Sequence, residues 1–115
     1  MYSGFMLDYE ITPAELAAKL IAADRDGVVL LDVREPAEYS LTRIDGSMLM
    51  PMGDVPSRAN QELDPESHII AICHHGVRSM NVAVWLRNQG FENTQSLRGG
   101  IDAWAALVDP TMPRY

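Results

Sequence analysis

The hydrophobic pattern of the chain is a series of short apolar runs separated by amphipathic or polar stretches. Residues 28–33 (VVLLDV) and 68–73 (HIIAIC) are nearly continuous apolar runs, which indicate strands that are covered on both faces. Residues 48–51 (MLMP) and 94–97 (TQSL) are predicted to form two further, shorter strands. The pattern therefore predicts a sheet with both of its faces covered.

Helical patterns fill the stretches between the predicted strands. The first helix follows Thr12, the expected N-cap, with Pro13 at its first position and Glu15 completing a capping box, and residues 24–27 (DRDG) end it. Further helices are predicted over residues 36–40, 79–88 and 99–107, with a brief one within residues 52–63. Strands that alternate with helices predict a mostly parallel sheet with helices on both faces.

The chain shows no sign of a second domain. No internal repeat, low-complexity segment or linker interrupts the order of predicted elements, and 115 residues are enough to bury one core. We therefore expect residues 1–115 to form a single α/β domain, with a core at about residues 9–107 and a short irregular C-terminal tail.

The charge balance and the cysteine count narrow the setting in which the protein works. Acidic residues outnumber basic ones by 16 to 9, which gives a formal net charge of −7 and argues against nucleic acids and membranes as partners. The N-terminus (MYSGFMLDYE) lacks the features of a secretory signal, and no apolar run approaches the roughly 20 residues that span a bilayer. The one cysteine, Cys73, cannot form an intramolecular disulfide, so a cytoplasmic, reducing location is expected.

Cys73 lies at the carboxyl end of a predicted buried strand. In parallel sheets, active-site residues usually lie in the loops that follow the carboxyl ends of the strands. Gly76 gives the backbone the freedom to turn into the next helix, and successive N–H groups in such a turn can form an anion-binding nest. With His74, His75 and Arg78 nearby, this position favours a thiolate. A lone cysteine that ends a buried strand is equally often a small core residue, so the pattern alone leaves both interpretations open.

A metal site at this position is not expected. Three consecutive residues rarely point at one ion, and the remaining histidine, His68, lies at the far end of the strand. The sequence therefore predicts no metal and no other cofactor.

Four motifs in order resemble those of the rhodanese-type sulfurtransferases. CHHGVRS at residues 73–79 resembles the family's active-site loop, and LLDVREPAEY, VAVWLRNQGF and LRGGIDAW resemble the segments before and after it. The resemblance runs from about residue 9 to residue 107 and implies a central five-stranded, mostly parallel sheet. One departure is Arg43, which stands where the family often carries the histidine of a Gly-His-Ile segment.

The resemblance also implies a mechanism and its partners. Cys73 would be the nucleophile, and His74, His75, Gly76, Val77, Arg78 and Ser79 would form the substrate-binding loop. A small anionic sulfur donor such as thiosulfate would leave a persulfide on Cys73, which passes its sulfur to cyanide or a thiol. A protein of a sulfur relay is a further candidate partner.

Several polar residues have two interpretations at this stage. Asp32 and Arg34 lie at the carboxyl end of a strand, where they either shape the substrate entrance or form charge pairs that hold the loops. Arg78 either contacts the anion or pairs with a nearby carboxylate such as Asp32, and we favour the pairing. Ser79 orients the thiolate, caps the helix, or does both.

Two other functions fit the same features. A cysteine-based phosphatase or arsenate reductase typically has five residues between cysteine and arginine, whereas this chain has only the four residues 74–77, which make a smaller cradle. A persulfide carrier or binding module in a sulfur relay needs the same cysteine and loop as the enzyme, so the sequence does not separate the two.

Overall fold

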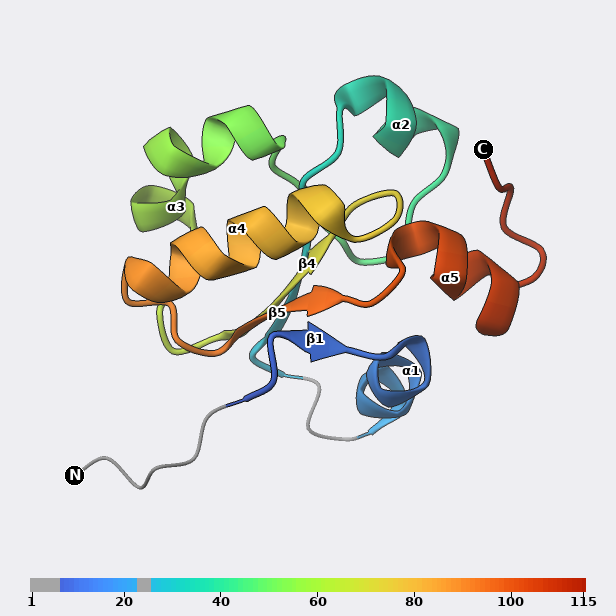
Figure 1. The fold of residues 1–115 in the computed structure, drawn as a ribbon, viewed down its shortest axis with the longest axis horizontal. Coiled ribbons are helices and arrows are strands. Elements are labelled where there is room, and N and C mark those ends of the chain that lie inside the picture. The colour runs from blue at the N-terminus through green and yellow to red at the C-terminus, as the bar shows by residue number, and fades with distance from the viewer. Residues whose placement is uncertain (1–6, 23–25) are drawn as a thin grey trace.

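The computed structural model describes residues 7–22 and 26–115 and contains one five-stranded sheet in which every pair of strands is parallel. The strands lie in the order β1-β5-β4-β2-β3 across the sheet (Figure 1). Their bounds are β1 (Glu10–Ile11), β2 (Val28–Asp32), β3 (Met48–Leu49), β4 (His68–Ile72) and β5 (Thr94–Leu97). The predicted α/β fold with a five-stranded parallel sheet is confirmed.

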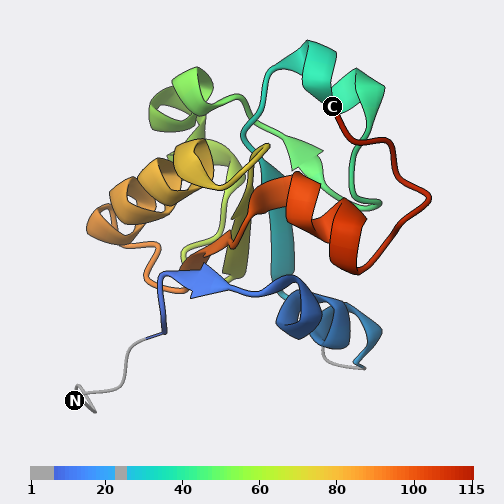
Figure 2. The same cartoon turned by 45° about the vertical axis from the view of Figure 1, so that its right-hand side comes forward.

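Helices lie on both faces of this sheet. Two of them, α1 (Pro13–Ile21) and α5 (Gly100–Leu107), cover one face, and α3 (Val55–Glu62) and α4 (Val77–Asn88) cover the other (Figures 1 and 2). The short helix α2 (Pro36–Leu41) follows β2, and a 3-10 turn, η1 (Met52–Asp54), precedes α3.

The continuous apolar runs of β2 and β4 are explained by two hydrophobic cores, one on each face. Leu31 and Ile69 point into the core beneath α3 and α4, whereas Leu30 and Ile70 point into the core beneath α1 and α5. Successive side chains of a strand face opposite ways, so a strand between two helical layers needs apolar residues at almost every position.

The helix boundaries follow the local signals closely. Thr12 Oγ1 accepts a hydrogen bond of 3.1 Å from the backbone N–H of Glu15, and the Glu15 carboxylate accepts one of 2.9 Å from the backbone N–H of Thr12, as the capping box predicts.

Two elements differ from the prediction. Helix α4 begins at Val77, two residues before the predicted start, because Gly76 and not Ser79 occupies its N-cap. The two-residue strand β1 has no counterpart among the strands predicted from the hydrophobic pattern.

Some sequence expectations concern residues beyond the described ranges. The expected lack of a secretory signal depends in part on residues 1–6, and the turn expected after the first helix includes residues 23–25, all of which lie outside the described residues. Among the residues that the structure describes, no helix combines the length and the apolar character that a membrane crossing requires.

The parallel register brings three strand ends to one edge of the sheet. Asp32 of β2 pairs with Ile72 of β4, and Ala71 of β4 pairs with Ser96 of β5. Because all strands run in one direction, Cys73 follows β4 at the same edge at which β2 and β5 end.

Candidate active site

The sulfur of Cys73 lies at the centre of a tight loop that joins β4 to α4, here called the cysteine loop (residues 73–79). Its Sγ accepts hydrogen bonds from the backbone N–H groups of Gly76, at 3.0 Å, and Ser79, at 3.3 Å. Gly76 makes this turn with φ +110°, a conformation that other residues rarely adopt. Backbone donors at the start of a helix stabilise negative charge, so the loop is suited to hold a sulfur anion.

The hydroxyl of Ser79 adds a side-chain contact to the same sulfur. Ser79 Oγ lies 3.3 Å from Cys73 Sγ and shares a hydrogen bond of 2.7 Å with Ser96 Oγ. The predicted capping role of Ser79 is wrong, because the cap position belongs to Gly76. Ser96 was not singled out from the sequence, although a serine that is fully buried in a strand is an unusual feature that points to a polar partner.

A second turn holds the backbone of the cysteine loop from behind. This glycine loop (residues 98–100) joins β5 to α5, and the N–H groups that follow it, of Ile101 and Asp102, donate to the carbonyl oxygens of Cys73, at 2.8 Å, and His74, at 3.1 Å. A Cβ atom at Gly100 would lie 2.5 Å from the Cys73 carbonyl oxygen and closer still to that of His74. Only glycine allows the two loops to approach this closely.

Asp32 and Arg34 form one ion pair in the interior. Two nitrogens of the Arg34 guanidinium donate to the Asp32 carboxylate, at 2.9 and 2.7 Å, and both side chains are fully buried. Arg34 also donates to the carbonyl oxygen of Thr42, at 2.6 Å, so the pair joins the end of β2 to the end of α2. Such a pair, with its remaining donors satisfied, holds these segments in place.

Arg78 also has a carboxylate partner, but not the one expected. Its two terminal nitrogens donate to Glu38 of α2, at 2.7 and 3.0 Å, so the predicted pairing with Asp32 is wrong. The pKa of Glu38 is lowered to about 2, most of all by the hydrogen bonds from Arg78. Asp32 is already occupied by Arg34, whereas α2 presents Glu38 to the start of α4.

The two histidines of the cysteine loop lie in a stack of aromatic rings. The His74 ring stacks on that of His75 on one side and on Tyr115 on the other, each with centroids 3.9 Å apart. His74 Nε2 is buried and has no hydrogen-bond partner among the described residues. The two histidines therefore lie at the outer side of the loop, with the His75 side chain largely exposed.

One group of side chains near the loop has metal-ligand chemistry. Atoms of His74, His75 and Asp102 that could bind an ion lie within 4.8 Å of one another. The Asp102 carboxylate, however, accepts two hydrogen bonds from Arg114, at 2.9 and 3.0 Å, and a cation would have to displace that guanidinium. The stacked rings and the occupied carboxylate do not form a ready ion site.

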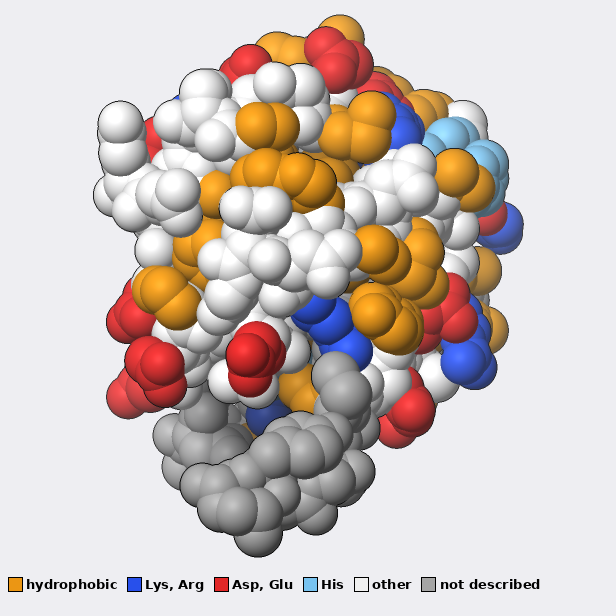
Figure 3. All heavy atoms as spheres, turned by 60° about the vertical axis from the view of Figure 1, so that its left-hand side comes forward, with side chains coloured by type: hydrophobic (Ala, Val, Ile, Leu, Met, Phe, Trp, Pro, Cys, Tyr) orange, Lys and Arg blue, Asp and Glu red, His pale blue; other side chains and the backbone are white. Residues whose placement is uncertain are grey.

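Three hollows among the described residues lie away from the cysteine loop. Three hollows of about 560, 190 and 520 Å³ are lined by none of the residues 73–79. The 190 Å³ hollow is an apolar groove between α3 and α4, on the face in Figure 3, and includes Val55 and Trp85. Cys73 itself is only 1% exposed, so its neighbours cover the sulfur almost completely.

Arg43 is exposed at the surface, just after α2. Its guanidinium donates to the Tyr39 carbonyl oxygen, at 3.2 Å, and lies over the Tyr39 ring, 4.8 Å from the centroid. Arg43, which departs from the family's usual histidine, therefore contributes to local packing around α2.

Comparisons with known proteins agree with this geometry. The family described as "Rhodanese-like domain" matches residues 12–107. The putative sulfurtransferase YtwF of Bacillus subtilis is 39% identical over 88% of this chain and 94% of its own length, and the thiosulfate sulfurtransferase GlpE of Pseudoalteromonas translucida is 32% identical over 86% and 93%. The chain covers only 31% of a longer relative, the Rhodanese-like/PpiC domain-containing protein 12 of Arabidopsis thaliana, at 38% identity over 78% of this chain.

A solved structure shows the same likeness in three dimensions. The rhodanese-like domain protein of Staphylococcus aureus superimposes with a TM-score of 0.79 at 28% sequence identity, over 94% of this chain and 99% of that one.

Proposed function

The chain belongs to the rhodanese-like domain family, and on this premise we propose that it is a sulfurtransferase that carries sulfane sulfur on Cys73. The observation that carries the proposal is the set of backbone N–H donors of Gly76 and Ser79 directed at the Cys73 sulfur. The relatives named as sulfurtransferases, which match this chain over most of their length, support the same class of reaction.

The reaction consists of two displacements at sulfur. The Cys73 thiolate attacks the outer sulfur of thiosulfate, the S–S bond of thiosulfate breaks, and its electron pair leaves with sulfite. A cyanide ion or a thiolate then attacks the outer sulfur of the Cys73 persulfide, which releases thiocyanate or a new persulfide and restores the Cys73 thiolate. No external oxidant or reductant is needed, and two successive displacements give ping-pong kinetics.

The residues around the sulfur have distinct roles in this proposal. The N–H groups of Gly76 and Ser79 stabilise the negative charge on the thiolate and on the persulfide. The Ser79 hydroxyl orients the sulfur, and His74 and His75 make the rim of the loop favourable for an anion. Asp32 and Arg34 hold the end of β2 against the end of α2, and in this proposal they do not contact the substrate.

The side chain of Arg78 argues against phosphatase chemistry. Both of its terminal nitrogens are engaged by Glu38, so they are not directed at the oxygens of a bound phosphate. With only four residues between Cys73 and Arg78, the cradle fits a single terminal sulfur better than a tetrahedral group.

A mass spectrum of the protein after incubation with thiosulfate tests the proposal. We expect a gain of one sulfur atom in the wild type, removed again by cyanide, and no gain in Cys73→Ser. An unmodified wild-type protein would contradict the proposal. Steady-state turnover of thiosulfate and cyanide, compared with sulfur uptake from a cysteine desulfurase, separates an enzyme that uses free thiosulfate from a carrier in a sulfur relay.

A further inference from the structure

The last eight residues of the chain return to the cysteine loop. Residues 108–115 contain no helix or strand and lie beyond the region that matches the family, which ends at residue 107. After α5 they run back past this helix, so that the C-terminal end lies beside α2 (Figures 1 and 2).

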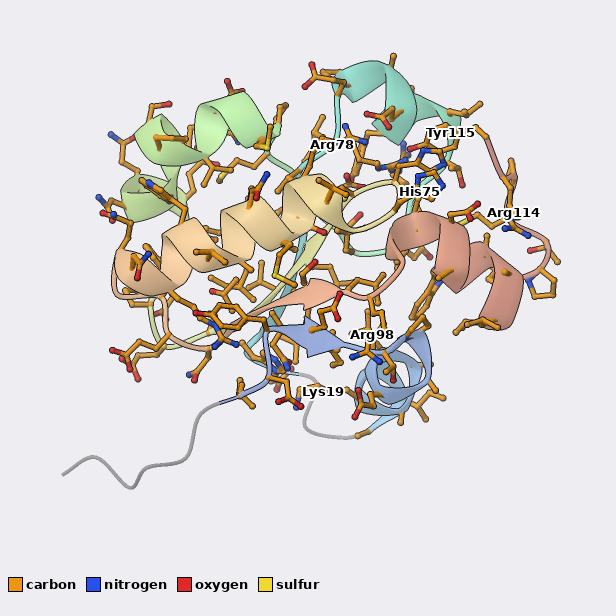
Figure 4. The ribbon with its side chains drawn as sticks, in the orientation of Figure 1. Lys19, His75, Arg78, Arg98, Arg114 and Tyr115 are labelled. Atoms are coloured by element: carbon orange, nitrogen blue, oxygen red, sulfur yellow. The ribbon has the colours of Figure 1, made fainter. Side chains whose placement is uncertain are left out.

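The side chains of Tyr115 and Arg114 hold this tail in place, one against the cysteine loop and α2 and the other against α5. Tyr115 stacks on His74 with the ring planes only 7° from parallel, and its hydroxyl donates to Glu38, at 2.7 Å, and accepts from Arg34, at 2.8 Å. Arg114 makes two hydrogen bonds to Asp102 in the first turn of α5. Figure 4 shows Tyr115 beside His75 at the outer end of the cysteine loop, with Arg114 on the α5 side.

These contacts connect the beginning of the cysteine loop to its end. His74 stacks on Tyr115, Tyr115 bonds to Glu38, and Glu38 pairs with Arg78. The tail thus spans the outside of a loop whose thiol is only 1% exposed. On this side of the loop the Tyr115 ring covers one face of the ring of His74, the residue that follows Cys73.

We propose that Arg114 and Tyr115 determine which molecules reach the Cys73 sulfur, admitting small anions and excluding bulky thiols while the tail is in place. This inference rests on the proposed sulfur transfer for its substrates, but access to the thiol is measurable by itself. Tyr115 is 40% exposed and the Arg114 side chain 56% exposed, so the contacts that hold the tail compete with water. A large acceptor therefore reacts only through the minor population in which the tail has moved away.

The first test measures access to the one thiol of the chain by alkylation. The variants Tyr115→Ala and Arg114→Ala are each labelled with iodoacetamide and with a fluorescein maleimide, and the rates are compared with the wild type. Arg58→Ala is the matched control, because Arg58, like Arg114, donates two hydrogen bonds to one carboxylate, that of Glu62, and belongs to α3 rather than to either loop or the tail. Tyr115→Phe keeps the ring and loses the hydrogen bonds.

We expect Tyr115→Ala to raise the rate at which the maleimide labels Cys73 about tenfold, because the tail no longer has to move away before the reagent enters. The rate of labelling with iodoacetamide should stay within about threefold of the wild-type rate. Arg114→Ala should act in the same direction with a smaller effect, Tyr115→Phe should lie between wild type and Tyr115→Ala, and Arg58→Ala should match wild type. Equal rate increases for both reagents, or no increase, would overturn the inference. Arg114→Ala removes only an exposed side chain, so it decides the question if Tyr115→Ala is poorly folded.

The second test compares two acceptors in sulfur transfer. We expect Tyr115→Ala to raise kcat/KM for glutathione relative to that for cyanide, with thiosulfate as the donor in both cases. If sulfur transfer is present but neither the acceptor ratio nor the labelling changes, the tail has no such role and the proposed function stands. If the labelling changes as expected but no variant gains sulfur, the tail controls access to Cys73 and the proposed function is wrong.

Discussion

The cysteine loop and the glycine loop are two solutions to the same local problem. Each leaves the carboxyl end of a central strand, turns through a glycine with positive φ, and starts a helix: Gly76 has φ +110° and Gly99 has φ +73°. In both, the first N–H groups of the helix need acceptors that lie outside it. The backbone alone would not show which of them carries out chemistry.

The difference lies in what the two helix starts bind. The N–H groups of Gly76 and Ser79 are directed at a sulfur atom, which can react, whereas those of Ile101 and Asp102 are directed at the carbonyl oxygens of the cysteine loop. One helix start therefore directs its donors at the proposed nucleophile, and the other fixes the loop that carries it. The comparison shows that the cysteine loop owes its shape to its neighbour as well as to its own glycine.

The strongest test of this comparison removes the sulfur from the first loop. We expect Cys73→Ser to lose all turnover of thiosulfate and cyanide, because a hydroxyl does not ionise usefully at neutral pH. The serine oxygen can still accept from the same backbone donors, so the free energy of unfolding should fall by no more than about 2 kcal/mol. Turnover well above background in this variant would remove Cys73 from the reaction.

A pair of glycine substitutions compares the two loops directly. In Gly100→Ala the new Cβ would collide with the carbonyl oxygens of Cys73 and His74, so we expect a loss of about 3 kcal/mol or more in the free energy of unfolding. In Gly76→Ala the nearest atom would be 3.5 Å away, so only the positive φ is penalised, at about 1–2 kcal/mol. Urea unfolding measures both, and equal losses would mean that the glycine loop does not restrain the cysteine loop.

The histidines test how much of the chemistry depends on side chains at the rim. We expect the double variant His74→Ala/His75→Ala to lower kcat/KM for thiosulfate by about 10- to 100-fold, as for the loss of accessory electrostatic contacts. The backbone donors around Cys73 remain in this variant, so part of the activity should survive. A loss as complete as that of Cys73→Ser would show that a histidine is indispensable.

The smallest effect concerns Glu38, which braces the end of the cysteine loop through Arg78. Its pKa is lowered from 4.5 to about 2, first by the hydrogen bond from Arg78, so its contribution to stability is complete above about pH 4.5 and is lost as the pH falls towards 2. The difference in free energy of unfolding between wild type and Glu38→Gln should therefore be constant at higher pH and shrink in that window. Urea titrations between neutral pH and about pH 2 measure this difference. A constant difference over the whole range would show that the pairing of Glu38 with Arg78 does not stabilise the fold.

Features that depend on neighbouring residues were predictable from the sequence. The capping box at Thr12, the buried runs of β2 and β4, and the position of Cys73 at a strand end follow from short-range patterns, because a side chain's periodicity and its backbone preference are local properties. The alternation of strands and helices extended these patterns to a parallel sheet. The resemblance of four motifs to one family then supplied the fifth strand, which is only two residues long and carries almost no signal of its own.

Contacts between distant residues were decided by the tertiary structure. The sequence suggested Asp32 as a partner for Arg78, but packing assigned Asp32 to Arg34, Glu38 to Arg78 and Asp102 to Arg114. The same holds for Ser96 beside Ser79, and for Tyr115, which lies 41 positions after the His74 ring that it covers. Residue types and spacing determine what kind of group a side chain can bind. Strand register and helix packing determine which of several equivalent partners lies within reach, because each charged side chain projects from its helix or strand in one direction only.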